Sequence, residues 1–188
     1  MARVSIPDKS FLRRIFEQVD ADKSGSISAV ELQTALSNGT WTPFNPETVR
    51  MMIGMFDRDG SSTIEFNEFE ALWRYVTEWE DCFRTFDTDN SGAIDKNELK
   101  TALSTFGYRL SDDFHSLFFF FFDFHSLLIR KFNRPGTAAG RVTFDDFIQM
   151  CVSLQTLTSA FRHFDKNQTG FITIGYEQFL RLVFTLDM

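Results

Sequence analysis

Residues 20–31 read Asp-Ala-Asp-Lys-Ser-Gly-Ser-Ile-Ser-Ala-Val-Glu, and residues 87–98 read Asp-Thr-Asp-Asn-Ser-Gly-Ala-Ile-Asp-Lys-Asn-Glu. Both stretches place oxygen-bearing side chains at the first, third and fifth positions, glycine at the sixth, isoleucine at the eighth and glutamate at the twelfth. A loop with this spacing can wrap its oxygens around one hard cation, and the glycine permits the sharp turn that the wrapping needs. The two stretches therefore predict two calcium-binding loops, each lying between two helices.

This is the EF-hand spacing, and it assigns a role to each position of the loop. The first, third and fifth residues supply side-chain oxygens, the seventh its carbonyl oxygen, and the twelfth both carboxylate oxygens, while the ninth acts through water. The expected ligands are Asp20, Asp22, Ser24, Ser26 and Glu31 in the first loop, and Asp87, Asp89, Ser91, Ala93 and Glu98 in the second. The alternative, two acidic turns facing solvent, does not account for the isoleucines or the helical flanks. We expect at least two calcium ions.

Three further loops carry the pattern with defects. Residues 57–68 have Gly60 at the fourth position and Ser62 at the sixth, and a positive φ at a serine costs about 1–2 kcal/mol, so we expect weaker binding. Residues 165–176 end on Tyr176 instead of glutamate, which also predicts weak binding. Residues 133–146 are two residues too long and carry Pro135, so we expect no ion there. The weaker ligand sets are Asp57, Asp59, Ser61, Thr63 and Glu68, and Asp165, Asn167, Thr169 and Phe171.

The spacing of the five loops predicts the fold. Their first ligands are separated by 37, 30, 46 and 32 residues. Residues 113–117 and 123–127 both read Asp-Phe-His-Ser-Leu, so removing residues 118–127 shortens the third interval to 36. We predict an all-α fold of five consecutive EF-hand helix-loop-helix units with short β pairing between loops. A tail covers residues 1–9 and the domain residues 10–188, with hands near 10–40, 46–75, 77–106, 111–153 and 155–186.

Local signals mark the ends of several helices. Asn45 before Pro46 is a helix start, and Gly107 is a helix end. Residues 66–86 and 144–164 contain neither proline nor glycine, so each is predicted to be one long helix shared by two hands. Short strands are expected at the isoleucine or valine of each loop, pairing the first hand with the second and the third with the fourth.

The fifth hand is left without a partner. We expect it to pair with the fifth hand of a second copy in a two-fold homodimer. That interface would bury Phe171, Ile174, Phe179, Leu182 and Val183. The alternative is a fifth hand folded back on its own chain.

Composition excludes several function classes. Of 188 residues, 19 are Lys or Arg and 26 are Asp or Glu, for a net charge of -7, which disfavours nucleic acid as a partner. No signal peptide or transmembrane segment is expected, which predicts an intracellular chain, and the isolated Cys82 and Cys151 suit reduced, buried thiols. His115, His125 and His163 lie near no nucleophile or metal-ligand pattern, so an enzyme is not expected.

The chain resembles the penta-EF-hand family in residues 35–46, 94–99, 106–111 and 144–149, and the likeness extends over all but residues 118–127. The resemblance implies a calcium-dependent adaptor that dimerises through its last hand and binds proline- and tyrosine-containing segments of endosomal-sorting and vesicle-coat proteins. It also admits a heterodimer with another chain of the family and a calcium-dependent membrane association. The implied locations are the cytoplasm, nucleus, endosomes and endoplasmic-reticulum exit sites.

The resemblance also implies a peptide pocket, which calcium opens by shifting an arginine. The matching residues are Trp41, Trp79, Phe106 and Tyr176, with Arg109 as the arginine. The alternative for each aromatic residue is a place in the core. Two other functions stay open, a passive calcium buffer and a calcium-binding regulatory subunit of an enzyme such as calpain.

The insertion at residues 118–127 departs from the family. Five of the 24 Phe form the run 118–122. A helix lengthened by ten residues would turn its downstream face by about 80°, an extruded loop would expose the run, and either copy of the repeated pentapeptide could begin the helix. We expect a lengthened or broken helix with the Phe run partly buried, and we interpret the insertion as a splicing or gene-model artefact rather than an evolved feature.

Overall fold

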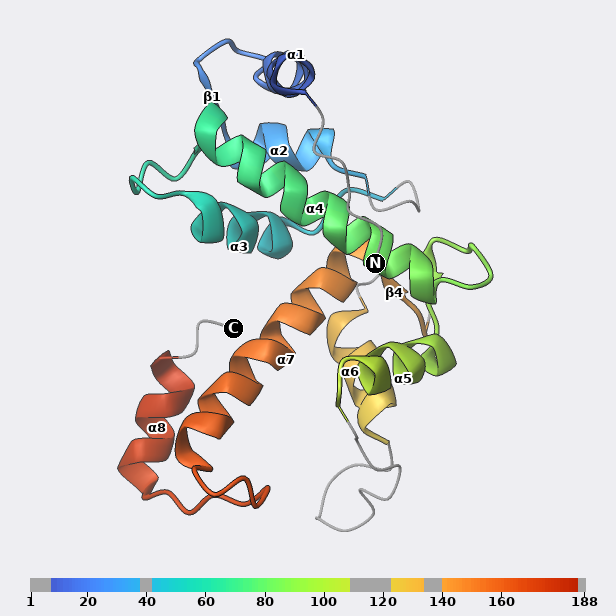
Figure 1. The fold of residues 1–188 in the computed structure, drawn as a ribbon, viewed down its shortest axis with the longest axis vertical. Helices are drawn as coiled ribbons and strands as arrows, with labels where there is room; N and C mark the ends of the chain where they lie inside the picture. Colours follow the sequence, from blue (N-terminus) through green and yellow to red (C-terminus); the bar gives the residue numbers. More distant parts are fainter. Residues whose placement is uncertain (1–7, 38–41, 109–122, 134–139, 186–188) are drawn as a thin grey trace. The chain divides into compact units, whose positions relative to one another are not determined.

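The computed structural model describes residues 8–37, 42–108, 123–133 and 140–185. It divides into two compact units, residues 1–148 and 149–188, and one helix runs from the first unit into the second (Figure 1). The elements are α1 (Lys9–Val19), β1 (Ser26–Ile27), α2 (Ala29–Ala35), α3 (Pro46–Phe56), β2 (Ile64–Glu65), α4 (Phe66–Phe86), β3 (Ala93–Ile94), α5 (Lys96–Thr105), α6 (Phe124–Phe132), β4 (Val142–Thr143), α7 (Phe144–Phe164) and α8 (Tyr176–Thr185). The predicted helical fold with short strand pairs is confirmed.

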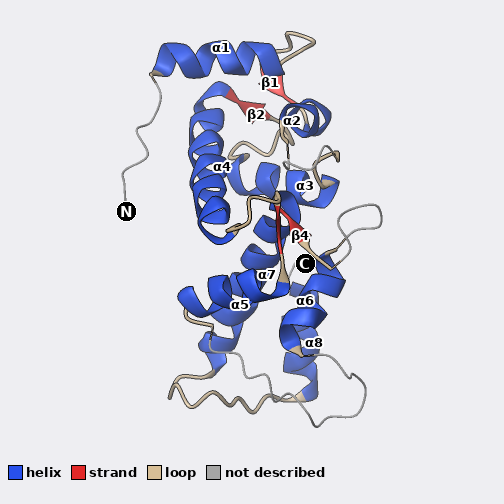
Figure 2. Cartoon of the chain, turned by 90° about the vertical axis from the view of Figure 1, so that its right-hand side faces the viewer, coloured by secondary structure: helices blue, strands red, loops and turns tan. Residues whose placement is uncertain are grey.

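Two antiparallel strand pairs join neighbouring loops, as Figure 2 shows for β1 and β2. Ile27 lies opposite Ile64 in β1 and β2, and Ile94 lies opposite Val142 in β3 and β4. All four side chains are fully buried. The predicted pairing of the first hand with the second and of the third with the fourth is therefore confirmed, and residues 171–175 of the fifth loop form no strand.

The two long helices have the bounds that the sequence predicted. α4 connects the second loop to the third and packs against α1, α3 and α5. At the start of α3, the Asn45 side chain accepts a 2.9 Å hydrogen bond from the Glu47 N–H, with Pro46 at the first helical position. At the end of α5, Gly107 has a φ of +91°, and the Tyr108 N–H donates to Leu103 O at 2.9 Å. Both predicted helix ends are confirmed.

Phenylalanines beside the loops form the core of the first unit. The Phe16 ring lies edge-on to Phe66 and Phe69, each 5.5 Å away between centroids. Phe83 packs in the same way on Phe144 at 5.4 Å and on Phe147 at 5.5 Å. These rings connect the helix that enters each pair of loops to the helix that leaves it.

α6 begins at Phe124, just after the Phe run and within the predicted insertion 118–127. The Asp123 side chain accepts from the Ser126 N–H at 3.1 Å, and Asp123 itself has φ -63° and ψ 160°, which is outside the helical region. The second copy of the repeated pentapeptide therefore starts the helix. One continuous helix running through the Phe run into α6 is therefore excluded, whereas the broken helix and the partial burial of the Phe run concern residues outside the described ones and stay predictions. Residues 118–122 themselves lie outside the described residues.

None of the described helices is long and apolar enough to cross a membrane.

Candidate metal centres and apolar pockets

The first loop holds its two end carboxylates with backbone N–H groups. Asp20 accepts from the Ser24 N–H through Oδ1 and from the Gly25 N–H through Oδ2, both at 2.9 Å. Glu31 accepts from the Ala21 N–H through Oε1 and from the Ser28 N–H through Oε2, both at 2.9 Å. The first and twelfth residues are thus fixed across the loop from each other.

The second and third loops repeat this network. In the third loop, Asp87 accepts from the Ser91 and Gly92 N–H groups, and Glu98 accepts from the Thr88 and Asp95 N–H groups, at 2.8–3.0 Å. In the second loop, Asp57 accepts from the N–H groups of residues 60–62 at 2.8–3.1 Å, and Glu68 accepts from those of residues 58 and 65 at 2.7 and 2.9 Å. The second loop is therefore built like the two that match the pattern fully.

Three carboxylates converge in each of these loops. Their ligand oxygens lie within 4.8 Å of one another in the clusters Asp20, Asp22 and Glu31, then Asp57, Asp59 and Glu68, then Asp87, Asp89 and Glu98. Ligands on opposite sides of a calcium ion lie about 4.6–5.2 Å apart, because each is about 2.3–2.6 Å from the ion. An all-oxygen donor set of this size suits calcium and does not suit zinc. The residues fit the ion that the spacing predicted.

The second loop carries its glycine at the fourth position instead of the sixth, and the backbone φ angles show what this changes. In the first, third and fifth loops, a non-glycine at the fourth position and the glycine at the sixth both have positive φ, for example Asn90 at 53° and Gly92 at 78°. The second loop has Gly60 at 74° and Ser62 at 61°. Glycine has therefore moved from one left-handed position to the other, and each loop keeps a single strained residue. The sequence predicted the strain at Ser62. It did not predict that Gly60 removes the strain that a non-glycine residue has at the fourth position of the other loops.

Among the described residues, the fourth and fifth loops do not bring three carboxylates together. Asp145 is fully buried and accepts from the Asn45 N–H and the Thr143 hydroxyl, each at 2.6 Å. Residues 134–139 of the fourth loop lie outside the described residues. In the fifth loop, Asp165 accepts from the Gly170 N–H at 2.7 Å, but Tyr176 at the twelfth position is 78% exposed. The fifth loop has the turn of a metal site without the closing carboxylate.

A capping role of the twelfth residue was missed by the sequence reasoning. The Ser28 and Asp95 side chains accept from the N–H groups of Glu31 and Glu98, and these glutamates accept in return from the N–H groups of residues 28 and 95. This reciprocal arrangement is a capping box, and its signal is a Ser or Asp three residues before the Glu. The same glutamate therefore starts the exiting helix and closes the metal site.

The hydrogen bonds keep loop carboxylates ionised. The Ser24 side chain and N–H lower the pKa of Asp22, and the Ser28 backbone and side chain lower the pKa of Glu31. The Ser91 side chain is the main cause of the lowered pKa of Asp89. Ionised carboxylates are the form that binds calcium.

The predicted peptide-pocket residues are divided between the first unit, the second unit and residues outside the described ranges. Trp41 and Arg109 lie outside the described residues. The Trp79 ring packs on Phe147 at 6.0 Å, while Phe106, which is 39% exposed, packs on Phe86 at 5.5 Å. Tyr176 belongs to the second unit. The assignment of these five residues to a pocket stays a prediction.

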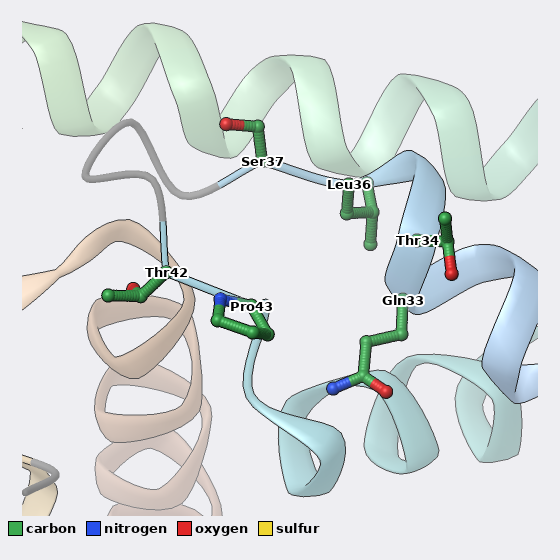
Figure 3. A pocket seen from close by; sticks show the side chains of 6 residues that line it. All are labelled: Gln33, Thr34, Leu36, Ser37, Thr42 and Pro43. Atoms are coloured by element: carbon green, nitrogen blue, oxygen red, sulfur yellow. The ribbon is translucent and has the colours of Figure 1, made fainter. Parts of the chain in front are cut away.

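Two cavities of the first unit lie beside the first hand. One, of about 440 Å³, is lined by polar and small side chains of α2 and the segment before α3, and Figure 3 shows Gln33, Leu36 and Pro43 around it. The Gln33 side chain donates to Phe44 O at 2.7 Å across this segment. Thr42, the neighbour of Trp41 in the sequence, also lines the cavity.

The other cavity, also of about 440 Å³, is more apolar, and we call it the α4 groove. Its lining includes Leu32 of α2 and Phe69, Leu72, Trp73 and Val76 of α4. The sequence did not predict this groove. The apolar residues 69, 72, 73 and 76 follow the spacing of one helix face, which was the available signal.

Comparisons with known proteins agree with this architecture. A family model described as an EF-hand domain pair matches residues 9–74, and one described as an EF-hand domain matches residues 78–107. The chain is 50% identical over 181 residues to sorcin from Schistosoma japonicum, covering 96% of this chain and 98% of that one. It is 38% identical to sorcin from Homo sapiens, covering 79% of that chain, and 39% identical to peflin from Xenopus laevis, covering 56% of it.

A solved structure of a homolog of programmed cell death 6 protein from Leishmania major Friedlin superposes with a TM-score of 0.76. The two chains are 30% identical, and the match covers 93% of this chain and 92% of the other. Residues 35–46, 94–99, 106–111 and 144–149 predict a likeness to programmed cell death protein 6, also called apoptosis-linked gene 2 protein, and the match to the structure of its homolog confirms the prediction.

Proposed function

The chain belongs to the penta-EF-hand family, and on this premise we propose that it is a calcium sensor and adaptor whose apolar groove receives a proline- and tyrosine-rich segment of another protein. It is a calcium-binding EF-hand protein. When bound, calcium supplies a divalent charge that holds the ligands of a loop together.

The first and third hands are proposed as the main calcium sites, because each carries the full ligand pattern and a converged carboxylate cluster. The second hand is proposed as a third site, because its loop has the same hydrogen-bond network. Calorimetry of Glu68→Gln tests this third site. Loss of one bound ion is expected, and an unchanged number of ions would exclude the second hand.

The observation that supports the sensor proposal is that the helices around the α4 groove begin or end at the predicted calcium-binding loops. α1 ends where the first loop begins, α2 starts where that loop ends, and α4 starts where the second loop ends. All three helices line the groove. Calcium that draws the end carboxylates of a loop together therefore acts on the walls of the groove.

This arrangement favours a sensor over a buffer. A sensor converts calcium binding into exposure of apolar surface, whereas a buffer hardly changes its helix angles. The Phe69 and Trp73 rings lie 5.9 Å apart between centroids, with Leu72 and Val76 beside them. Phe69 and Leu72 are buried, whereas Trp73 and Val76 are half-buried. Proline-rich segments are already extended, so they dock on such aromatic surfaces at a low entropic cost.

The partners follow from the same proposal. We propose that the chain binds endosomal-sorting and vesicle-coat proteins that carry proline- and tyrosine-rich segments. The exposed side chains of the fifth hand support a homodimer through this hand, and a heterodimer with another chain of the family would use the same surface. The proposed location is the cytoplasm, with recruitment to endosomes and endoplasmic-reticulum exit sites.

Fluorescence anisotropy of a labelled Pro-Tyr-rich peptide tests the function. Binding is expected in calcium and not in excess chelator, and Trp73→Ala should weaken it at least tenfold. Tyr75→Ala is the matched control, because the half-buried Tyr75 also lies on α4 but does not line the groove and is not a predicted pocket residue. Circular dichroism checks that both variants fold. Peptide binding that ignores calcium would overturn the sensor proposal.

A further inference from the structure

An arginine of the fourth loop contacts a predicted calcium ligand of the third. Arg141 Nη1 lies 3.2 Å from Asp89 Oδ2, and the two side chains are 33% and 48% exposed. The other oxygen of Asp89, Oδ1, accepts from the Ser91 N–H at 3.0 Å. Both oxygens of this ligand are therefore engaged by protein groups in the structure.

The strand pairing holds Arg141 in place. Arg141 directly precedes β4, whose Val142 lies opposite Ile94 of β3. The Asn133 side chain donates to Arg141 O at 2.6 Å, which fixes the backbone from the other side of the fourth loop. The arginine reaches the third loop because the two loops are paired, although it lies 52 residues away in the sequence.

The first hand provides an internal comparison. In β1 and β2, Ile27 lies opposite Ile64, so the position that matches Arg141 is Thr63. Thr63 carries no charge, and its hydroxyl lies 2.9 Å from the Ser61 hydroxyl within its own loop. Asp22, the counterpart of Asp89, forms no ion pair with any residue that the structure describes. The two pairs of loops share one framework and differ in this cation.

Charge determines the sign of the effect. Asp87, Asp89 and Glu98 carry three formal negative charges, which attract the guanidinium of Arg141. A calcium ion cancels two of them, so the attraction falls when the ion binds, whether or not Arg141 stays on Asp89. A group that stabilises the calcium-free form more than the calcium-bound form must lower the calcium affinity.

We infer that Arg141 is an affinity-setting residue of the third hand, which weakens calcium binding there by holding Asp89 in the calcium-free state. The inference rests on the proposed use of the third hand as a calcium site. An exposed ion pair is worth little, so the expected effect is about two- to fivefold in the dissociation constant.

Nuclear magnetic resonance of the full chain resolves the two hands during a calcium titration. The Gly25 N–H donates to Asp20 and the Gly92 N–H donates to Asp87, so these two amides report the first and third hands separately. Arg141→Gln should lower the calcium concentration at half-saturation of the Gly92 signal about two- to fivefold and leave Gly25 unchanged. Arg141→Lys, which keeps the charge, should stay close to the parent chain.

Thr63→Arg is the converse variant, and it should raise the half-saturation concentration of Gly25 without affecting Gly92. The gain from Arg141→Gln should also shrink at high salt, because exposed charges are screened. An unchanged Gly92 midpoint in Arg141→Gln, or an equal shift at both glycines, would overturn the role of Arg141. A Gly92 signal that ignores calcium in the parent chain would overturn the third-hand site itself.

Discussion

Ser62 shows how one residue can keep a loop functional in spite of a broken pattern. Its φ of 61° is one that side chains with a Cβ rarely adopt, and its N–H still donates to Asp57 at 2.8 Å, as the glycine N–H does in the other loops. Gly60 takes the other left-handed position at no steric cost. A search for glycine at the sixth position alone therefore underestimates this loop.

Ser62→Gly should stabilise the calcium-free chain by about 0.5–1 kcal/mol. The substitution removes about 1–2 kcal/mol of left-handed strain and adds the entropic cost of a glycine, about 0.5–1 kcal/mol. Urea unfolding in chelator measures the difference. Ser62→Ala is the control, since it retains the Cβ. A glycine variant no more stable than the alanine variant would argue against strain at this position.

The start of α6 could be narrowed to two positions from the sequence, but the choice between them depends on tertiary contacts. The repeated pentapeptide identified two candidate starts, and nothing local distinguishes Asp113 from Asp123. Tertiary contacts favour the second copy, because Lys96 Nζ binds Asp123 Oδ2 at 2.6 Å and places the following Leu128, Ile129 and Phe132 in the core. The first copy would place phenylalanines at those positions instead.

Asp123→Ala should lower the free energy of unfolding by about 1–2 kcal/mol at neutral pH, because it removes the helix cap. Burial raises the pKa of Asp123, but hydrogen bonds from Lys96 and Ser126 outweigh it and hold the pKa well below its usual value of 3.8. A lowered pKa means that the stabilisation is complete above the unfolded value and is lost as the pH falls below it.

The difference between the parent chain and Asp123→Ala should therefore shrink between about pH 5 and about pH 2. Urea unfolding in chelator across this range measures it. Asp123→Asn, which keeps an acceptor for the Ser126 N–H, should lose less than the alanine variant. A difference that does not depend on pH would contradict the role of the ionised carboxylate.

Deletion of residues 118–127 should leave α6 intact. Because of the repeat, this deletion produces the same chain as removing residues 113–122, so Asp123 and the whole of α6 are retained in effect. The free energy of unfolding should be equal to or higher than that of the parent chain, since no described core residue is lost. A drop of several kcal/mol in urea unfolding would show that the insertion contributes to the core.

At the scale of the whole molecule, the sequence predicted the fold more fully than it predicted the contacts between separate loops and helices. The loop spacing gave five hands, the apolar eighth residues gave the strand pairs, and uninterrupted stretches gave α4 and α7. The α4 groove and the contact of Arg141 with Asp89 were not predicted, because both depend on which loops and helices meet in space. The residue spacing within one loop does not show whether a charged side chain of another loop contacts it.

The fifth hand leaves large apolar side chains at the surface of the second unit. Phe171 is 83% exposed, Phe179 49% and Val183 38%. Phe179 and Val183 share one face of α8, being four residues apart, whereas the ion pair of Arg181 with Glu177 lies on the other face. A two-fold dimer through this hand would cover the apolar face, as the sequence predicted.

Val183→Asp should convert the dimer to a monomer in sedimentation velocity, because it buries a charge in the proposed interface. Arg181→Asp introduces the same carboxylate on the opposite face and should leave the dimer in place. Equal behaviour of the two variants would place the interface elsewhere.

The central claim is that calcium occupies the first and third hands, closed by Glu31 and Glu98. Isothermal titration calorimetry of the chelator-treated chain tests it most directly, with Glu31→Gln, Glu98→Gln and the double variant measured beside the parent. The account predicts at least two ions for the parent chain, one fewer for each single variant, and two fewer for the double variant. A double variant that binds as many ions as the parent with unchanged affinity would contradict the account.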